Sequence, residues 1–504
     1  MVHLFKPTSY RTGAALAVGA TLAWKIVSFA NALLVALYFG ADRATDVYFY
    51  IIMMMGFGVT FLQRMNAAAV IPEAMTLDTQ TPGGGRPLLN GFLYFYLLLM
   101  LSLTALGFFC PVRLTGLLSR FDASQLTAQR TLLAWGFLLF GLQLLTYYLT
   151  AVLEMYHRFA TAVFTPLNAL LPLVFLLCFG RTAGIISMIY GMAAANAVQI
   201  AVFLWIMKKE LAWNFTHVSV RPARTFAKNL VSNQLIELAN IAASLLPLYL
   251  LSGLSAGLVS ALNYAKQLAD SPTEIFTMRV TNVSKIQLTE SAAKNDEAAL
   301  NANFLNTQHF LLFLLTPLAV FTAFYAPEIV TLFFKRGEFN ARDVYQAAAF
   351  LRPLMGVMLF MAPVLMQNNA VAAGRKLKEF LPYALAGIVL FIALTPVTVR
   401  LWGAFAYPYA QIACCFVGLY LNYLFFRKHF PFIAYGFSLR RAARLLAVNV
   451  IALFPSAVYA FFGAGTNAFV TVLIGGIIFL AALFWLTRRS GDWDDFLRQL
   501  FERV

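Results

Sequence analysis

Charged residues inside long apolar stretches are the residues of this sequence best suited to bind a ligand. Lys25, Arg64 and Lys266 each interrupt a stretch that is long enough to cross a membrane. A charge at the bilayer centre costs roughly 3 kcal/mol on insertion scales, so it should face the interior of a helix bundle or a water-filled cavity. Lysine supplies a point charge, and arginine supplies a planar fork that matches phosphate oxygens. These cations therefore predict a cavity for an anionic substrate, such as a phosphate or pyrophosphate headgroup.

Acidic residues in the same kind of stretch could hold these cations in place. Glu237 lies in one apolar stretch, and Asp270 follows Lys266 by one helical turn in another. Residues four apart share a helix face, so Lys266 and Asp270 could simply neutralise each other. Salt bridges between helices, or side chains that extend to the membrane interface, are the alternative to a substrate site. The residues alone leave both interpretations open.

The composition places most of the chain in a membrane. Apolar residues make up 61% of the 504 residues and charged residues 12%, whereas a soluble domain averages about 45–50% and about 25%. A water-soluble fold cannot remove so much apolar surface from solvent. The net charge of +16 is concentrated in short loops, where topology and anionic headgroups explain it better than nucleic acid does.

The elements that must position the cations are membrane-spanning helices, because each span needs about 20 apolar residues. We predict an all-α polytopic protein with fourteen spans, at residues 13–39, 46–72, 88–110, 131–154, 160–180, 184–207, 227–253, 256–284, 304–326, 343–372, 378–399, 402–426, 442–463 and 466–487. Lys and Arg are more than twice as frequent in the loops on one side, which places both termini in the cytoplasm. The segment after Gly491, with Trp493 and Phe496 among charges, predicts an amphipathic helix on the membrane surface.

Several chemistries find no support in the sequence. The run Gly83-Gly84-Gly85 lacks the Lys-Ser/Thr that completes a phosphate-binding P-loop. No group of histidines, cysteines and acids has the spacing of metal ligands. We therefore expect no catalytic residues, no metal and no cofactor, and a transporter rather than an enzyme.

Three motifs carry a resemblance to a known family. Residues 25–31 read Lys-Ile-Val-Ser-Phe-Ala-Asn, and residues 39–49 read Phe-Gly-Ala-Asp-Arg-Ala-Thr-Asp-Val-Tyr-Phe. Residues 264–268 read Tyr-Ala-Lys-Gln-Leu, with Pro272 after them, and residues 334–339 read Phe-Lys-Arg-Gly-Glu-Phe. In order and spacing these motifs resemble the MurJ (MviN) lipid II flippases of the multidrug/oligosaccharidyl-lipid/polysaccharide exporter superfamily.

The resemblance implies an architecture and an activity. Residues 1–225 and 226–430 would form two six-helix lobes with a V-shaped cavity, and residues 431–504 would add a helix pair and the amphipathic tail. The activity would be export of a polyprenyl-pyrophosphate-linked glycan across the bacterial cytoplasmic membrane by alternating access. We expect a monomer surrounded by anionic lipids, with no nucleic acid partner. The membrane potential, worth about 2.3 kcal/mol per charge per 100 mV, or an ion gradient would drive it.

The resemblance also assigns roles to residues. Lys25 and Asp46 stand at a basic and an acidic position of the family motif, and Arg64 stands at one of a pair of arginines. The expected substrate-binding residues are Lys25, Asn31, Arg64, Lys266 and Gln267. The expected gating residues are Asp46, Glu237 and Asp270.

Three positions depart from the family pattern, since Asn31, Gln63 and Gln267 stand where the family usually has arginine. A glycan other than that of lipid II is therefore an open alternative. An exporter of O-antigen or exopolysaccharide units is a second, and a cation-coupled drug antiporter of the same superfamily is a third. A drug antiporter should favour acidic over basic residues in its cavity, because its typical substrates are cations.

Overall fold

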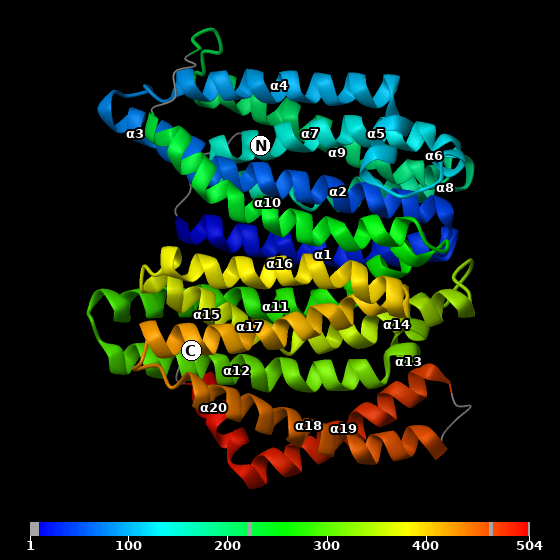
Figure 1. Cartoon of the computed structure of the whole chain (residues 1–504). Helices are drawn as coiled ribbons and strands as arrows, with labels where there is room; N and C mark the ends of the chain where they lie inside the picture. Colours follow the sequence, from blue (N-terminus) through cyan, green and yellow to red (C-terminus); the bar gives the residue numbers. More distant parts are fainter. Residues whose placement is uncertain (1–9, 219–223, 463–466, 502–504) are drawn as a thin grey trace. The chain divides into compact units, whose positions relative to one another are not determined.

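The computed structural model describes residues 10–218, 224–462 and 467–501 (Figure 1). Of these, residues 10–15, 160, 224–236, 272–276, 278–279, 281–283 and 498–501 are described as backbone only. Within these residues every regular element is a helix. Contacts divide the chain into two compact units, Met1–Ser260 and Ala261–Val504, and the division lies in the first turn of α11. The lobe boundaries expected at residues 225 and 430 remain predictions.

Over residues 10–218 and 224–252, the first unit contains ten α-helices and two short helices of other types. In chain order these are α1 (Tyr10–Phe39), α2 (Arg43–Met65), the π-helix η2 (Asn66–Val70), α3 (Ile71–Gln80), α4 (Arg86–Phe109), α5 (Pro111–Leu118), α6 (Ala123–Ala128), α7 (Arg130–Met155), the 3₁₀-helix η3 (Phe159–Phe164), α8 (Leu167–Ala183), α9 (Ile186–Glu210) and α10 (Arg224–Ser252).

The second unit follows with α11 (Leu258–Ala293), α12 (Glu297–Phe324), α13 (Ala326–Phe334), α14 (Ala341–Met358), α15 (Met361–Ala373), α16 (Leu377–Trp402), the 3₁₀-helix η4 (Ala404–Ala406), α17 (Tyr407–His429), α18 (Tyr435–Phe462), α19 (Ala468–Ser490) and α20 (Asp492–Phe501).

Twelve of the predicted spans coincide with helical segments that are long and apolar enough to cross a membrane. Eleven are continuous, and the twelfth is the pair α14–α15, which is bent by 41°. Pro363 explains the bend, because proline has no N–H for the carbonyl of residue 359. Helices α10 and α11 occupy the other two predicted spans, but among their described residues only Glu237–Ser252 forms an apolar helix, and a short one. The exact count of fourteen therefore remains a prediction, as does the placement of the termini.

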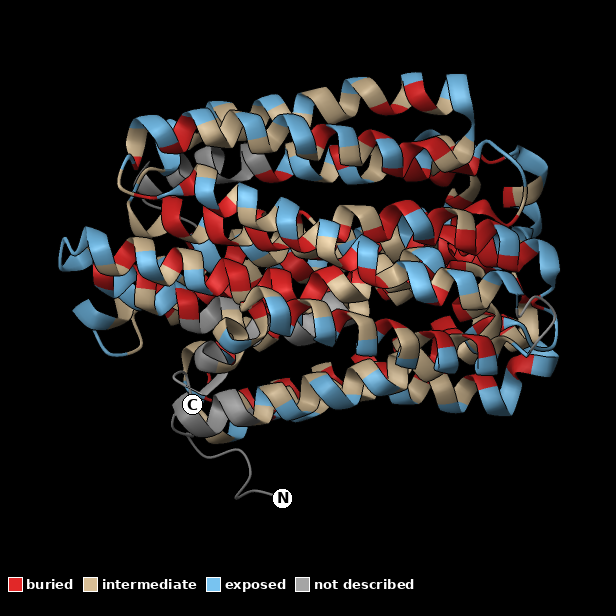
Figure 2. Ribbon diagram, turned by 90° about the horizontal axis from the view of Figure 1, so that it is seen from below, coloured by how far each residue is buried: buried red, intermediate tan, exposed pale blue. Residues whose placement is uncertain are grey.

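Apolar residues are exposed along these helices as well as buried between them. Figure 2 shows exposed and buried residues alternating along single helices. On α16, Val389, Leu401 and Trp402 are all exposed. Exposing such an apolar surface to water would be unfavourable, whereas contact with lipid is favourable. The protein is a multi-pass membrane protein.

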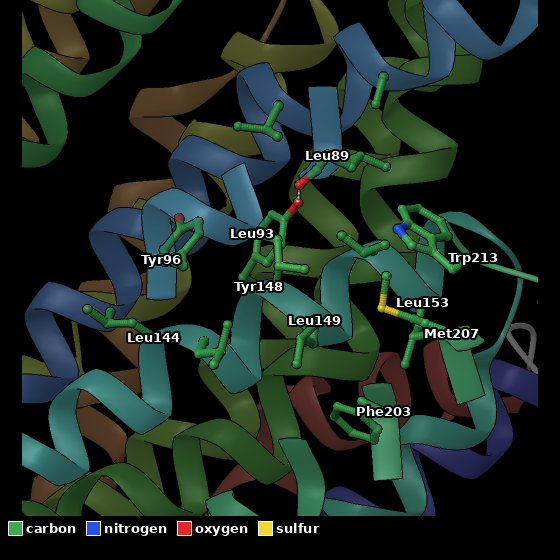
Figure 3. Close-up of a cluster of buried hydrophobic side chains, with 14 of the residues drawn as sticks. Leu89, Leu93, Tyr96, Leu144, Tyr148, Leu149, Leu153, Phe203, Met207 and Trp213 are labelled. Carbon is green, nitrogen blue, oxygen red and sulfur yellow. Dashed lines mark hydrogen bonds between the residues drawn. The ribbon is translucent and has the colours of Figure 1, made fainter. Parts of the chain in front are cut away.

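The core of the first unit lies between α2, α4, α7 and α9 (Figure 3). Leu93, Leu144 and Leu149 are buried there, and Tyr148 donates a hydrogen bond of 2.5 Å to the carbonyl of Leu89. Satisfying a buried hydroxyl in this way is necessary in a region from which water is excluded. The core therefore gives α2 a rigid surface to pack on.

The C-terminal helix α20 packs against two other helices of the second unit. Trp493 and Phe496 contact Phe313 of α12, with ring centroids 6.0 and 4.5 Å apart respectively, and Trp493 also meets Phe484 of α19 at 5.1 Å. The helix is amphipathic, as predicted, and its two aromatic side chains are partly buried by ring packing on α12 and α19. Its position on the membrane surface remains a prediction.

Candidate functional site

The candidate site is centred on Arg64 in the last turn of α2. Its Nη1 atom lies 2.5 Å from the Oε2 atom of Glu237 on α10. The Arg64 side chain is 63% exposed, whereas that of Glu237 is 8% exposed. The structure thus brings together two residues for which the family resemblance implied different roles, Arg64 in substrate binding and Glu237 in gating.

The electrostatics of this pair leave Arg64 able to bind a second anion. A buried carboxylate needs a compensating charge, and Arg64 supplies it to Glu237. A guanidinium has five N–H donors, of which this contact uses one. Because most of the Arg64 side chain is exposed, the other donors are accessible. The buried carboxylate of Glu237 therefore holds the exposed guanidinium of Arg64 in position.

A π-helical segment begins two residues after Arg64. In η2 the Oδ1 atom of Asn66 accepts a hydrogen bond of 3.0 Å from the hydroxyl of Tyr96 on α4. The Tyr96 ring stacks on Tyr148 of α7, with centroids 4.8 Å apart, so η2 is fixed to the core shown in Figure 3. Short π segments inside helices occur frequently at functional sites. Asn66 and Tyr96 were not among the residues predicted from the sequence, where the signal for them is an amide and a hydroxyl in apolar stretches.

The two expected binding residues on α1 have different environments. Lys25 is half-buried, and its Nζ atom lies 5.2 Å from the ring centroid of Trp24. Asn31 is buried, and its Nδ2 atom donates a hydrogen bond of 2.8 Å to the carbonyl of Ala169 on α8. Asn31 therefore joins α1 to α8. The substrate-binding roles of Lys25 and Asn31 remain predictions.

Asp46 lies in the first turn of α2 and caps the start of α11. Its carboxylate accepts hydrogen bonds from the backbone N–H groups of Gly257 at 2.6 Å and Ser260 at 2.8 Å, and from the hydroxyl of Ser260 at 2.7 Å. Gly257 has a φ of 89°, a left-handed conformation that glycine tolerates best. All three donors are uncharged groups at a helix N-terminus, where a carboxylate is favourable. The gating role of Asp46, in which it pairs with a cation, remains a prediction.

The remaining expected residues lie on α11 in the second unit. Lys266 and Gln267 are half-buried and Asp270 is exposed. The hydroxyl of Ser271 donates a hydrogen bond of 2.6 Å to the backbone carbonyl of Gln267, which leaves the Gln267 amide out of that contact. Their joint action with Arg64 remains a prediction.

Comparisons with known proteins agree with this architecture. A family model described as lipid II flippase MurJ matches residues 35–480. A curated relative, the probable lipid II flippase MurJ of Bdellovibrio bacteriovorus, is 24% identical over 255 residues. That alignment covers 48% of this chain and 48% of the relative, so the chain spans about half the length of the curated relative it matches.

Solved structures show the same fold at low sequence identity. A structure described as lipid II flippase MurJ in the inward closed conformation has a TM-score of 0.77 and 18% identity, and the match covers 94% of this chain and 99% of that chain. An inward-facing multidrug resistance transporter of the MATE family has a TM-score of 0.62 and 13% identity, with 80% and 94% covered. The family model spans most of the chain, and the fold agrees with it. The chain belongs to the MurJ lipid II flippase family.

Proposed function

We propose that this protein is a flippase that moves an undecaprenyl-pyrophosphate-linked saccharide from the cytoplasmic to the periplasmic leaflet of the bacterial inner membrane. The family match over residues 35–480 supports a lipid-linked substrate. The observation that carries the proposal is the exposed guanidinium of Arg64, which lies in a segment long and apolar enough to span a membrane and is held by buried Glu237. An accessible cation in such a segment suits a pyrophosphate. No covalent step is required, and the membrane potential or an ion gradient would supply the driving force.

In this mechanism Glu237 is the internal counter-ion of Arg64 while the site is empty. A pyrophosphate entering the site competes for the same guanidinium, and its several oxygens match the arginine fork better than one carboxylate oxygen does. The Arg64–Glu237 contact joins α2 to α10, so weakening it would loosen these two helices from each other. Substrate binding and helix movement would be coupled, because the substrate would interact differently with α2 and α10 when they are joined and when they are loosened.

The test is transport by reconstituted protein with Arg64→Ala, Arg64→Lys and, as a matched control, Arg113→Ala. Arg113 is an exposed arginine on α5 in the same unit. Losing a charge-assisted hydrogen bond costs about 1.5–3 kcal/mol, so Arg64→Ala should flip lipid-linked pyrophosphate at least tenfold more slowly. Arg64→Lys should retain part of the rate, and Arg113→Ala all of it. A wild-type rate for Arg64→Ala at normal abundance would contradict the proposal.

The glycan is tested separately. In cells depleted of their lipid II flippase, expression of this protein should restore growth if lipid II is the substrate. Failure to restore growth, combined with Arg64-dependent transport of another pyrophosphate-linked glycan, would instead identify an O-antigen or exopolysaccharide exporter. A drug antiporter would show neither behaviour.

A further inference from the structure

A second basic site lies away from Arg64, at the end where α18 begins and α19 ends. A pocket of about 540 Å³ is lined there by Arg440, Arg441 and Arg444 of α18 and by Asp492 and Asp495 of α20. Three guanidinium groups face two carboxylates, so the lining keeps a positive charge. The proposed transport function does not use this pocket.

Arg441 is the arginine that the C-terminal helix neutralises most directly. Its Nη2 atom lies 2.5 Å from Oδ2 of Asp495 and 3.9 Å from Oδ1 of Asp492. The same Nη2 atom lies 2.9 Å from Nε2 of the buried His309 on α12. Because a guanidinium can only donate, His309 accepts through Nε2 and is neutral. Arg441 is thus positioned by His309 and occupied by the carboxylates of α20.

Arg440 and Arg444 are far less engaged. They are four residues apart, so they project from one face of α18. Arg444 is 56% exposed, and its contacts with Oδ2 of Asp492 at 3.8 Å and with the carbonyl of Ser490 at 3.4 Å are long. The Nε atom of Arg440 donates a long hydrogen bond of 3.4 Å to the carbonyl of Gly436 in its own helix. Most donors of these two side chains are accessible, and the planar fork of each guanidinium matches phosphate oxygens.

The surroundings favour a phosphate that carries acyl chains over a free one. Phe437, which lines the pocket, is exposed, and so is Trp485 on α19. The guanidinium carbon of Arg489 lies 5.5 Å from the Trp485 ring centroid, and that of Arg488 lies 6.0 Å from the ring of Phe484. Arginine over an exposed aromatic ring is typical of the level of lipid headgroups. The pocket therefore opens beside an apolar surface at the membrane interface.

We propose that Arg440 and Arg444 bind the phosphate headgroup of an anionic phospholipid, and that Asp492 and Asp495 of α20 compete with it for this arginine cluster. The acyl chains lie along the exposed apolar face of α18 and α19. The carboxylates occupy Arg441 while the lipid is absent. A bound headgroup weakens their attraction to the cluster, and α20 then depends on Trp493 and Phe496 for its docking on α12.

The test measures binding of short-chain phosphatidylglycerol to the full-length protein in detergent, with short-chain phosphatidylcholine and inorganic phosphate as the other probes. Each arginine near a membrane surface contributes about a fivefold factor in affinity. Arg440→Gln/Arg444→Gln should therefore weaken phosphatidylglycerol binding by about tenfold or more. The control is Arg427→Gln/Lys428→Gln, an exposed pair at the end of α17 that removes the same charge. It should bind as the wild type does, with equal melting midpoints for all variants.

The competing role of α20 is tested with Asp492→Asn/Asp495→Asn, which should bind phosphatidylglycerol several-fold more tightly. Asp494→Asn is the control, since Asp494 is exposed and does not line the pocket. Unchanged or weaker binding by the double variant would overturn the competition. If the Arg440/Arg444 and Arg427/Lys428 double variants lost the same affinity for phosphatidylglycerol, binding would depend on general surface charge and not on this site. Phosphate binding as tight as phosphatidylglycerol binding would overturn the lipid assignment, and none of these outcomes bears on transport through Arg64.

Discussion

The Nη1 atom of Arg64 lies 2.5 Å from the Oε2 atom of Glu237, although 173 residues separate them in the chain. One partner is exposed and the other is buried, so their interaction is asymmetric. Most of the Arg64 side chain is exposed, whereas the buried carboxylate of Glu237 depends on Arg64 for a compensating charge. The pair therefore stabilises the fold modestly and sets how strongly Arg64 attracts other anions.

Glu237→Gln is predicted to increase the affinity of the site for pyrophosphate. The amide keeps the size of the side chain and removes the competing charge, so Arg64 becomes an uncompensated cation. Calorimetric titration with geranyl pyrophosphate should give a dissociation constant several-fold lower than that of the wild type. Glu154→Gln, a change at an exposed acid on α7 in the same unit, should leave the affinity unchanged. Weaker binding by Glu237→Gln would contradict the counter-ion role.

Asp46→Ala is predicted to destabilise the protein by about 2–4 kcal/mol, because it leaves the backbone N–H groups of Gly257 and Ser260 without their acceptor. Asp42→Ala is the comparison. It removes the exposed N-cap of α2, whose side chain accepts from the backbone N–H of Thr45 at 2.8 Å, and should cost only about 1 kcal/mol. Thermal unfolding in detergent ranks the two variants. Equal melting midpoints would show that the Asp46 contacts contribute little.

Tyr96→Phe is predicted to loosen the π-helical segment while keeping the core packed. The ring stacking on Tyr148 is retained, but Oδ1 of Asn66 loses its donor, which costs about 1–3 kcal/mol for a buried acceptor. Transport should fall together with stability, because Arg64 lies two residues from Asn66. Tyr94→Phe, which removes an exposed hydrogen bond to the carbonyl of Phe215, should change neither. An unaltered transport rate in Tyr96→Phe would show that transport does not depend on this hydrogen bond to the π-helical segment.

Gly191→Ala is predicted to push α8 and α9 apart. A Cβ atom at position 191 would lie 2.5 Å from the Cα atom of Pro172, and backbone cannot move aside as a flexible side chain can. Overpacking of this kind costs about 1–3 kcal/mol. Gly56→Ala on α2 is the matched control, since its Cβ would meet nothing within 4 Å. The melting midpoint should fall for Gly191→Ala and should stay the same or rise for Gly56→Ala.

The spans were predictable where apolar composition alone decides, which is why twelve segments agree with the structure. The spans predicted at α10 and α11 agree less well with the structure, because these helices contain fewer apolar residues. Their packing partners cannot be read from hydropathy. The roles of single residues were harder to predict. Nothing near Asp46 in the sequence indicates that Gly257 and Ser260 are its donors, because the fold alone brings position 46 to the start of α11.

The same limit applies to the Arg64–Glu237 pair. Both residues could be selected from the sequence as charges in apolar stretches, but their contact depends on how α10 packs against α2. The π-helical segment has no sequence signature either, because Asn66–Val70 reads as ordinary helix apart from one amide. The hydrogen bond from Tyr96 of α4 to Asn66 cannot be read from the local sequence either.

That π-helical segment makes the rotation of Arg64 adjustable. A π turn contains one residue more than an α turn, and each residue of an α-helix turns the chain by about 100° and advances it about 1.5 Å. If the extra residue moved from Asn66–Val70 to a position before Arg64, the arginine would turn by about that angle relative to α3. The guanidinium would then face a different side of the helix, although neither end of the α2–α3 span had unfolded.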